Sequence, residues 1–170
     1  PAYLHGENQK LSLLPVDQIG KVTPTPVSYH ESGAQIALNG QWTICHQEGL
    51  ERDARYLGRQ IKTVFGTAPK TRVGTAAAKE TIVLKTGTVT VAGESKAEGS
   101  EAYTLAANSE SGIVIQGADT DGVFYGIQTL LQLLPPTSFA GKNSQVVIPA
   151  VEVADAPRFA YRGQHIDVSH

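Results

Sequence analysis

The stretch DTDGVFYGIQTLLQLLPP, residues 119–136, decides much of the fold. Its apolar residues recur every three or four positions, a spacing that predicts an α-helix with a wide apolar face. Asp119 and Asp121 are typical of a helix N-terminus, and Pro135 and Pro136 end the pattern. The apolar positions are Val123, Phe124, Ile127, Leu130, Leu131 and Leu134. A face of this width predicts more apolar surface than one sheet can cover.

Two glycines, Gly122 and Gly126, lie four residues apart and therefore on one face of this helix. Small residues at this spacing predict close approach to a sheet or to a neighbouring helix. The glycine-rich run 117–126 lacks the G-K-[ST] ending of a phosphate-binding loop, so packing is the favoured interpretation.

A second helix is predicted earlier in the chain, over residues 50–65. Its apolar positions are Leu50, Ala54, Leu57, Ile61, Val64 and Phe65, and charged residues fill the positions between them. Gly66 follows as a natural C-terminal stop.

Short apolar and β-branched runs outside these helices predict strands. The predicted hairpins pair residues 34–38 with 42–45 across Asn39-Gly40, and residues 102–106 with 113–116 across residues 108–112. Further strands are predicted at 27–30, 71–73, 81–84, 146–153 and 161–168, with a polar loop at 93–100. This order predicts an α+β fold, an antiparallel or mixed sheet with two helices packed on it.

Composition excludes several classes of function. The 170 residues are 41% hydrophobic and carry a formal net charge of -2 without a basic stripe, which argues against a nucleic-acid partner. No apolar run approaches the roughly 20 residues that a membrane-spanning helix needs. Cys45 is the single cysteine, so no intrachain disulfide forms, and its neighbours favour a small buried side chain over a nucleophile.

Candidate catalytic and metal-binding groups each have a simpler structural explanation. His46 and Glu48 lack the H-E-x-x-H spacing of a zinc site, and we expect neither a metal nor another cofactor. The carboxylate pair Asp119 and Asp121 suggests glycosidase chemistry, but its position at a helix N-terminus favours capping. Asp167, although close to Ser169 and His170, cannot form a catalytic relay with them along one strand, because adjacent strand residues face opposite ways.

Three motifs, in the same order, resemble glycoside hydrolase family 20 β-N-acetylhexosaminidases. The run 121–135 is similar to the G-x-x-Y-G-x-Q-T-L-x-Q-L helix of the small domain that precedes their catalytic barrel. The run 157–169, PRFAYRGQHIDVS, is similar to the P-R-F-x-Y-R-G-x-x-x-D-x-S segment that leads into their first barrel strand. Residues 101–105, EAYTL, match an E-x-Y-x-L strand of the same small domain.

The resemblance implies a domain organisation. Residues 1–21 would be a leader or the end of a preceding domain, residues 22–153 the accessory α+β domain, and residues 154–170 the start of a truncated (β/α)₈ barrel. It also implies a periplasmic or extracellular bacterial protein. The expected partners are the parent's own catalytic barrel and a glycan that contains N-acetylhexosamine.

The resemblance also implies chemistry and one binding residue. Family members remove terminal β-linked N-acetylglucosamine or N-acetylgalactosamine by a retaining mechanism in which the substrate's acetamido group assists. Their catalytic Asp-Glu pair is missing, since the chain contains no Asp-Glu dipeptide, so we expect no catalytic residue and no turnover in this chain. Arg162 matches the arginine that grips sugar hydroxyls, and Asp167 matches a structural or supporting residue of the same strand.

Two alternatives remain open at this stage. One is a self-standing carbohydrate- or protein-binding module, against which the single tryptophan and the few other aromatic residues argue. The other is a related glycosidase family that shares the small domain, against which the P-R-F-x-Y-R-G match argues.

Overall fold

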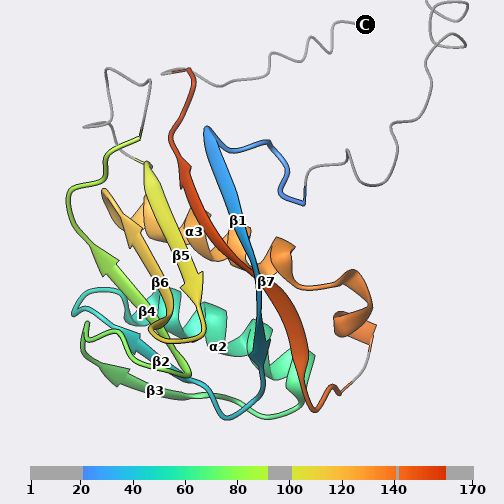
Figure 1. Ribbon diagram of the computed structural model, residues 1–170. Helices are drawn as coiled ribbons and strands as arrows, with labels where there is room; N and C mark the ends of the chain where they lie inside the picture. Colours follow the sequence, from blue (N-terminus) through green and yellow to red (C-terminus); the bar gives the residue numbers. More distant parts are fainter. Residues whose placement is uncertain (1–20, 92–100, 141, 160–170) are drawn as a thin grey trace, which may run out of the picture.

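The computed structural model describes residues 21–91, 101–140 and 142–159, which form one mixed sheet with two α-helices on one face (Figure 1). The elements in chain order are β1 (Ser28–Leu38), β2 (Thr43–His46), α2 (Glu51–Phe65), β3 (Lys70–Val73), β4 (Thr81–Thr86), β5 (Tyr103–Asn108), β6 (Gly112–Gly117), α3 (Thr120–Leu133), the 3-10 helix η2 (Pro136–Ala140) and β7 (Val146–Asp155). The predicted α+β class is confirmed. The predicted loop at 93–100 and strand at 161–168 lie outside the described residues.

The seven strands are ordered β1-β7-β5-β6-β4-β2-β3. Parallel pairing joins β3 to β2, β2 to β4 and β4 to β6, whereas β6–β5, β5–β7 and β7–β1 are antiparallel. Ile82, Val83 and Leu84 on β4 are fully buried, as their consecutive apolar run predicts for a strand covered on both faces. The predicted hairpin between β5 and β6 is confirmed.

The predicted hairpin between residues 34–38 and 42–45 is wrong. The turn itself forms, because the Asn39 side chain accepts a hydrogen bond from the Gln41 backbone at 2.9 Å. However, β1 pairs only with β7 among the described strands, while β2 lies between β3 and β4. The reason is burial: residues 44–46 are buried, which suits an interior strand, whereas most of β1 is exposed and suits an edge.

Both helices begin and end close to where the sequence predicts. Gly66 takes a left-handed backbone conformation (φ 78°) after α2, and its N–H donates to the Lys62 carbonyl at 2.7 Å. Asp119 caps α3, because its carboxylate accepts a hydrogen bond from the Gly122 N–H at 2.8 Å. The capping interpretation of this acidic residue is therefore confirmed.

The close approach that Gly122 and Gly126 predict is present in α3. A Cβ atom at Gly122 would lie 2.3 Å from the Ala102 carbonyl oxygen, and one at Gly126 would lie 2.4 Å from Ile115 Cγ2. A side chain at either position would collide with the sheet, so α3 packs directly against β5 and β6 (Figure 1).

The main core fills the space between the sheet and the two helices. From α3 it takes Val123, Ile127, Leu130 and Leu133, which are nearly inaccessible to solvent. Phe124 and Tyr125 remain 39% and 38% exposed on the outer side of the same helix. The prediction that this helix has more apolar surface than its sheet covers is confirmed.

Candidate functional site

A groove opens where the described chain leaves the sheet, and we call it the exit groove. Its cavity measures about 290 Å³. Three walls enclose it: residues 22–25, residues 125–132 of α3 together with residues 101–103 beside them, and residues 155–159. The lining residues are Val22, Thr23, Pro24, Thr25, Glu101, Tyr103, Tyr125, Gln128, Thr129, Gln132, Asp155, Ala156, Pro157, Arg158 and Phe159.

The inner wall of the exit groove contains a buried pair of hydroxyl groups. The Tyr103 and Thr129 oxygens lie 2.5 Å apart, and both side chains are buried. Burial raises the pKa of Tyr103 to about 12; the Thr129 hydrogen bond opposes this shift and the Asp155 charge adds to it. The pair is therefore neutral at physiological pH and links β5 to α3.

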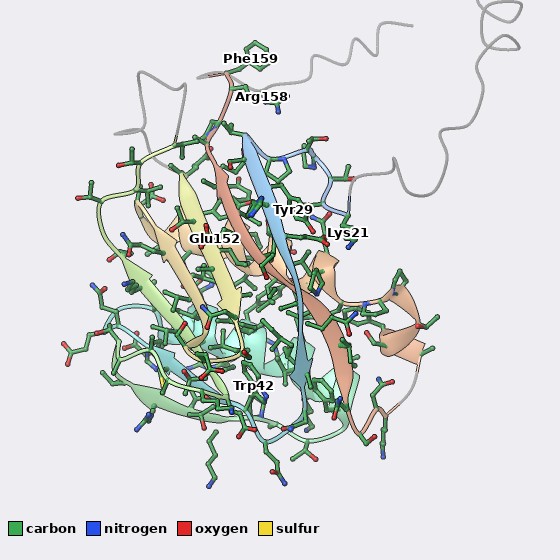
Figure 2. The ribbon with its side chains drawn as sticks, in the orientation of Figure 1. Lys21, Tyr29, Trp42, Glu152, Arg158 and Phe159 are labelled. Carbon is green, nitrogen blue, oxygen red and sulfur yellow. The ribbon has the colours of Figure 1, made fainter. Side chains whose placement is uncertain are left out.

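The rim of the exit groove is aromatic. Phe159 is 71% exposed, and Tyr125 on α3 also lines the groove. Figure 2 shows Phe159 and Arg158 beyond the end of β7. Exposed aromatic side chains beside a concave surface are typical of a contact with another protein surface.

Residues 22–27, which we call the strap, are tied to both other walls of the groove. The Thr23 N–H donates to Gln132 Oε1 at 2.8 Å, and Arg158 Nη2 donates to the Thr25 carbonyl at 2.9 Å. The Val27 N–H donates to Asp155 Oδ1 at 3.1 Å. These bonds join segments about 110 to 130 positions apart in the sequence.

Asp155, the last residue of β7, is the partly buried carboxylate of this arrangement. Burial raises its pKa, while hydrogen bonds from the Val27 and Ala156 backbone and the nearby Arg158 charge act in the opposite direction. Its side chain thus holds the strap before β1 against the end of β7.

Lys21, the residue before the strap, is held at the β1 edge of the sheet. Lys21 Nζ lies 2.7 Å from Glu31 Oε1, and the Tyr29 hydroxyl donates to the same carboxylate (Figure 2). The hydrogen bond from Lys21, followed by that from Tyr29, lowers the pKa of Glu31. Burial, followed by the bond to Glu31, raises the pKa of Tyr29.

A second hollow, the helix hollow, lies between α2 and the N-terminus of α3. Tyr56 and Phe124 form its aromatic part, with ring centroids 5.5 Å apart, and the Arg59 guanidinium lies 6.0 Å from the Tyr56 centroid. Burial and, to a smaller extent, the Asp121 charge raise the pKa of Asp53. This hollow is on the helix side that the sheet does not cover.

The sequence-predicted site residues, Arg162 and Asp167, lie outside the described residues, so their roles stay predictions. Cys45 is buried as expected, and Arg72 Nε donates to its sulfur at 3.3 Å. Sequence reasoning missed Asp155. The only local signal is an acidic residue at a strand end shortly before a proline, because its partner Val27 is 128 positions away.

Residues 21–91, 101–140 and 142–159 contain no group of three or more His, Cys, Asp or Glu side chains arranged to hold a metal ion. In these ranges, no helix has both the length and the apolar character needed to span a membrane.

The fold and the groove define a class, an α+β domain that exposes aromatic residues of one helix beside the point where its chain leaves the sheet. A family model described as glycosyl hydrolase family 20, domain 2, matches residues 20–156. The chain therefore belongs to glycosyl hydrolase family 20 and contains its domain 2.

Known relatives agree with this assignment. A beta-hexosaminidase of Porphyromonas gingivalis is 29% identical over 150 residues, which are 86% of this chain and 18% of the relative. A beta-hexosaminidase of Vibrio vulnificus is 45% identical over 96 residues, which are 53% of this chain and 10% of that protein. The chain thus spans less than a fifth of the length of these relatives.

Solved structures show the same fold. The family 20 beta-N-acetylhexosaminidase from Streptomyces coelicolor A3(2) superimposes with a TM-score of 0.65 at 26% identity, over 84% of this chain and 27% of that one. A family 20 exo beta-N-acetylglucosaminidase from Vibrio harveyi gives a TM-score of 0.61 at 23% identity, over 84% of this chain and 20% of its own.

Proposed function

We propose that this chain supplies the non-catalytic N-terminal domain of a β-N-acetylhexosaminidase. The observation that carries the proposal is the family 20 domain 2 match over residues 20–156, together with relatives several times longer than this chain. The parent enzyme would hydrolyse terminal β-linked N-acetylglucosamine or N-acetylgalactosamine with assistance from the substrate's own acetamido group. Residues 154–170 would lead into its catalytic barrel.

In this proposal the domain supports the barrel through its helix face. The aromatic rim of the exit groove and the helix hollow are on the side that the sheet does not cover. Phe159 is the last described residue, so the groove lies where the chain continues toward the proposed barrel. The alternative of a self-standing binding module is not favoured, because the family 20 domain 2 match covers residues 20–156.

The docking part of the proposal is tested with Tyr125→Ser and Phe159→Ser in the longer enzyme. We expect the thermal transitions of the domain and the barrel to separate, because the apolar contact that couples them is lost. The matched control is Val147→Ser, which changes a 42% exposed apolar residue that does not line the groove. A single unchanged transition in both groove variants would contradict the docking.

The site in this proposal is Arg162, which would donate two parallel hydrogen bonds to hydroxyls of the terminal sugar. Arg162→Ala in the longer enzyme should lower kcat/KM on the order of 30- to 1000-fold. This corresponds to a loss of about 2–4 kcal/mol in transition-state stabilisation. Arg162→Lys should restore only part of the activity, because an ammonium group cannot present two parallel donors.

The control for Arg162 is Lys70→Ala, which removes an exposed cation from β3. Its kcat/KM should equal that of the wild type, and the melting temperature should change little in all three variants. If Arg162→Ala stays within about threefold of wild type, or if its loss follows unfolding, this assignment is wrong.

A further inference from the structure

We propose that the present chain, on its own, forms a two-fold symmetric dimer in which α2 of each copy lies over α3 of the other. Both helices lie on the same side of the sheet, and their outer surfaces carry the contact (Figure 1). The inference goes beyond the proposed function, because it names a second copy of this chain as the occupant of that surface when no barrel covers it.

Three aromatic rings form a continuous ridge across the two helices, which we call the aromatic ridge. The ring centroids of Tyr56 on α2 and Phe124 on α3 are 5.5 Å apart, and those of Phe124 and Tyr125 are 6.0 Å apart. Phe124 lines the helix hollow and Tyr125 lines the exit groove, so the ridge stands between two concave surfaces. Exposed aromatic rings of this kind are typical of the centre of a protein interface.

The charges beside the aromatic ridge point to a second copy as the occupant. Basic residues outnumber acidic ones on α2, and its exposed Arg52 and Arg59 line the helix hollow. Over the whole of α3, all of which the structure describes, Asp121 is the single charged residue, and it is exposed in the same hollow. Neither Arg59 nor Asp121 forms an ion pair with another described residue. A basic α2 and an acidic α3 are complementary, and every copy of the chain has both.

A two-fold axis that runs between α2 and α3 brings the complementary surfaces together. Each contact then occurs twice, because a two-fold interface pairs the same patch of both copies. Arg59 of one copy faces Asp121 of the other, and Tyr56 of one copy packs against Phe124 of the other. Burial of the rings supplies the affinity, and the exposed charges fix which helix lies over which.

The first test is sedimentation equilibrium of the present chain over a range of concentrations. We expect a monomer–dimer equilibrium with a Kd on the order of 10 μM, as for a small interface with few aromatic contacts. Phe124→Ser should weaken the dimer by about 10-fold or more. The matched control is Val147→Ser, which changes a 42% exposed residue of β7 and should leave the Kd unchanged. Its neighbours Val146 and Ile148 belong to the core beneath the helices, so Val147 faces the opposite side of the sheet.

The second test exchanges the charges of the two helices. Arg59→Glu places like charges opposite Asp121 of the other copy, and Asp121→Arg places like charges opposite Arg59. Each variant alone should dimerise about 10-fold more weakly, because the repulsive contact occurs twice. In an equimolar mixture the two altered helices face each other and so do the two unaltered ones. The mixed dimer should therefore form with a Kd within about threefold of the wild type.

The control for the exchange is the pair Lys70→Glu and Glu152→Lys, which reverses exposed charges on β3 and β7. Neither variant should change the Kd, alone or mixed. Circular dichroism establishes that each variant is folded. If Asp121→Arg does not fold, Asp121→Asn replaces it, and its mixture with Arg59→Glu should associate more tightly than Arg59→Glu alone.

Three results would overturn the inference. The first is a wild-type chain that stays monomeric at every concentration. The second is a mixture of the two charge variants that associates no more tightly than either variant by itself. The third is association that continues beyond two copies, because a two-fold interface is closed at the dimer.

The longer enzyme separates this inference from the proposed docking. A barrel docked on the helix side covers the aromatic ridge, so we expect the longer enzyme not to form this dimer. If the longer enzyme does form it, with the same response to the exchange of charges, the dimer stands and the docking fails. If the present chain is monomeric, the dimer fails and the docking is unaffected.

Discussion

The Tyr103 hydroxyl on β5 and the Thr129 hydroxyl on α3 lie 2.5 Å apart in the interior, where they connect the sheet to the helix that lines the exit groove. Tyr103→Phe should lower the free energy of unfolding by about 1–2 kcal/mol, because Thr129 is left buried without this partner. Urea denaturation measures the change. Adding Thr129→Val should cost less than the two single changes summed, since both partners are then removed.

The control for this pair is Tyr56→Phe. The Tyr56 hydroxyl accepts a bond from Gln128 Nε2 at 3.2 Å, but the tyrosine is only partly buried. Its loss should lower the free energy of unfolding by less than about 0.5 kcal/mol. Equal effects at Tyr56 and Tyr103 would show that burial of the hydroxyl pair contributes nothing.

The raised pKa of Tyr103 predicts a loss of stability in alkali. The phenol ionises near pH 10 in the unfolded chain but, because of burial, only near pH 12 in the folded one. The contribution of the neutral Tyr103 side chain to the free energy of unfolding is therefore complete below pH 10 and is lost as the pH rises to 12. Relative to Tyr103→Phe, the wild type should lose up to about 2–3 kcal/mol of unfolding free energy across this range. Parallel stability curves for the two proteins would contradict the shift.

The glycines of the two helices should respond in opposite ways to alanine. Gly122→Ala should destabilise the domain by about 3 kcal/mol or more, because the new methyl group would lie 2.3 Å from the Ala102 carbonyl oxygen. A Cβ atom added at Gly58 on α2 would meet no atom closer than 3.8 Å. Gly58→Ala should therefore stabilise the domain by roughly 0.5–1 kcal/mol through helix propensity. The midpoints of thermal unfolding distinguish the two. A stabilising Gly122→Ala would mean that α3 can move away from β5.

Asp119 should act through stability and not through chemistry. Its carboxylate accepts the Gly122 N–H at 2.8 Å and the Glu101 N–H at 3.1 Å, so Asp119→Ala should cost about 1–2 kcal/mol of unfolding free energy. Asp121→Ala, which removes only an exposed first-turn charge, should cost about 0.3–1 kcal/mol. In the longer enzyme, activity should fall only with the folded fraction. A lower kcat in fully folded Asp119→Ala would contradict the capping role.

The present chain should not hydrolyse a chromogenic β-N-acetylglucosaminide above the rate in buffer, since it contains no Asp-Glu dipeptide to serve as the catalytic pair. The matched control is Asp53→Asn, because Asp53 and Asp121 face one hollow and Asp53 has a raised pKa. Turnover that purifies with the chain and disappears in Asp53→Asn would place a catalytic site in the helix hollow and contradict the proposed function.

The sequence alone determined the two helices and their limits. The helices were predicted from their apolar spacing, the Asp119 cap and the Gly66 stop. Each of these features depends on residues within a few positions of one another, so a short stretch of sequence is enough to predict it. The burial of residues 82–84 and the β5–β6 hairpin could be predicted from the sequence for the same reason. The roles of Arg162 and Asp167 come from motif resemblance and remain predictions.

Only the tertiary structure decided the partners of β1 and β2 and the construction of the exit groove. The Asn39 turn is typical of a hairpin, yet β2 pairs with β3 and β4. The residues of β2 are buried in this interior position, and an edge position would leave them exposed. Asp155 and Val27 meet across 128 positions, and Tyr103 and Thr129 across 26. Such contacts exist only once the sheet has formed, because each depends on the simultaneous placement of several strands and not on the residues next to it.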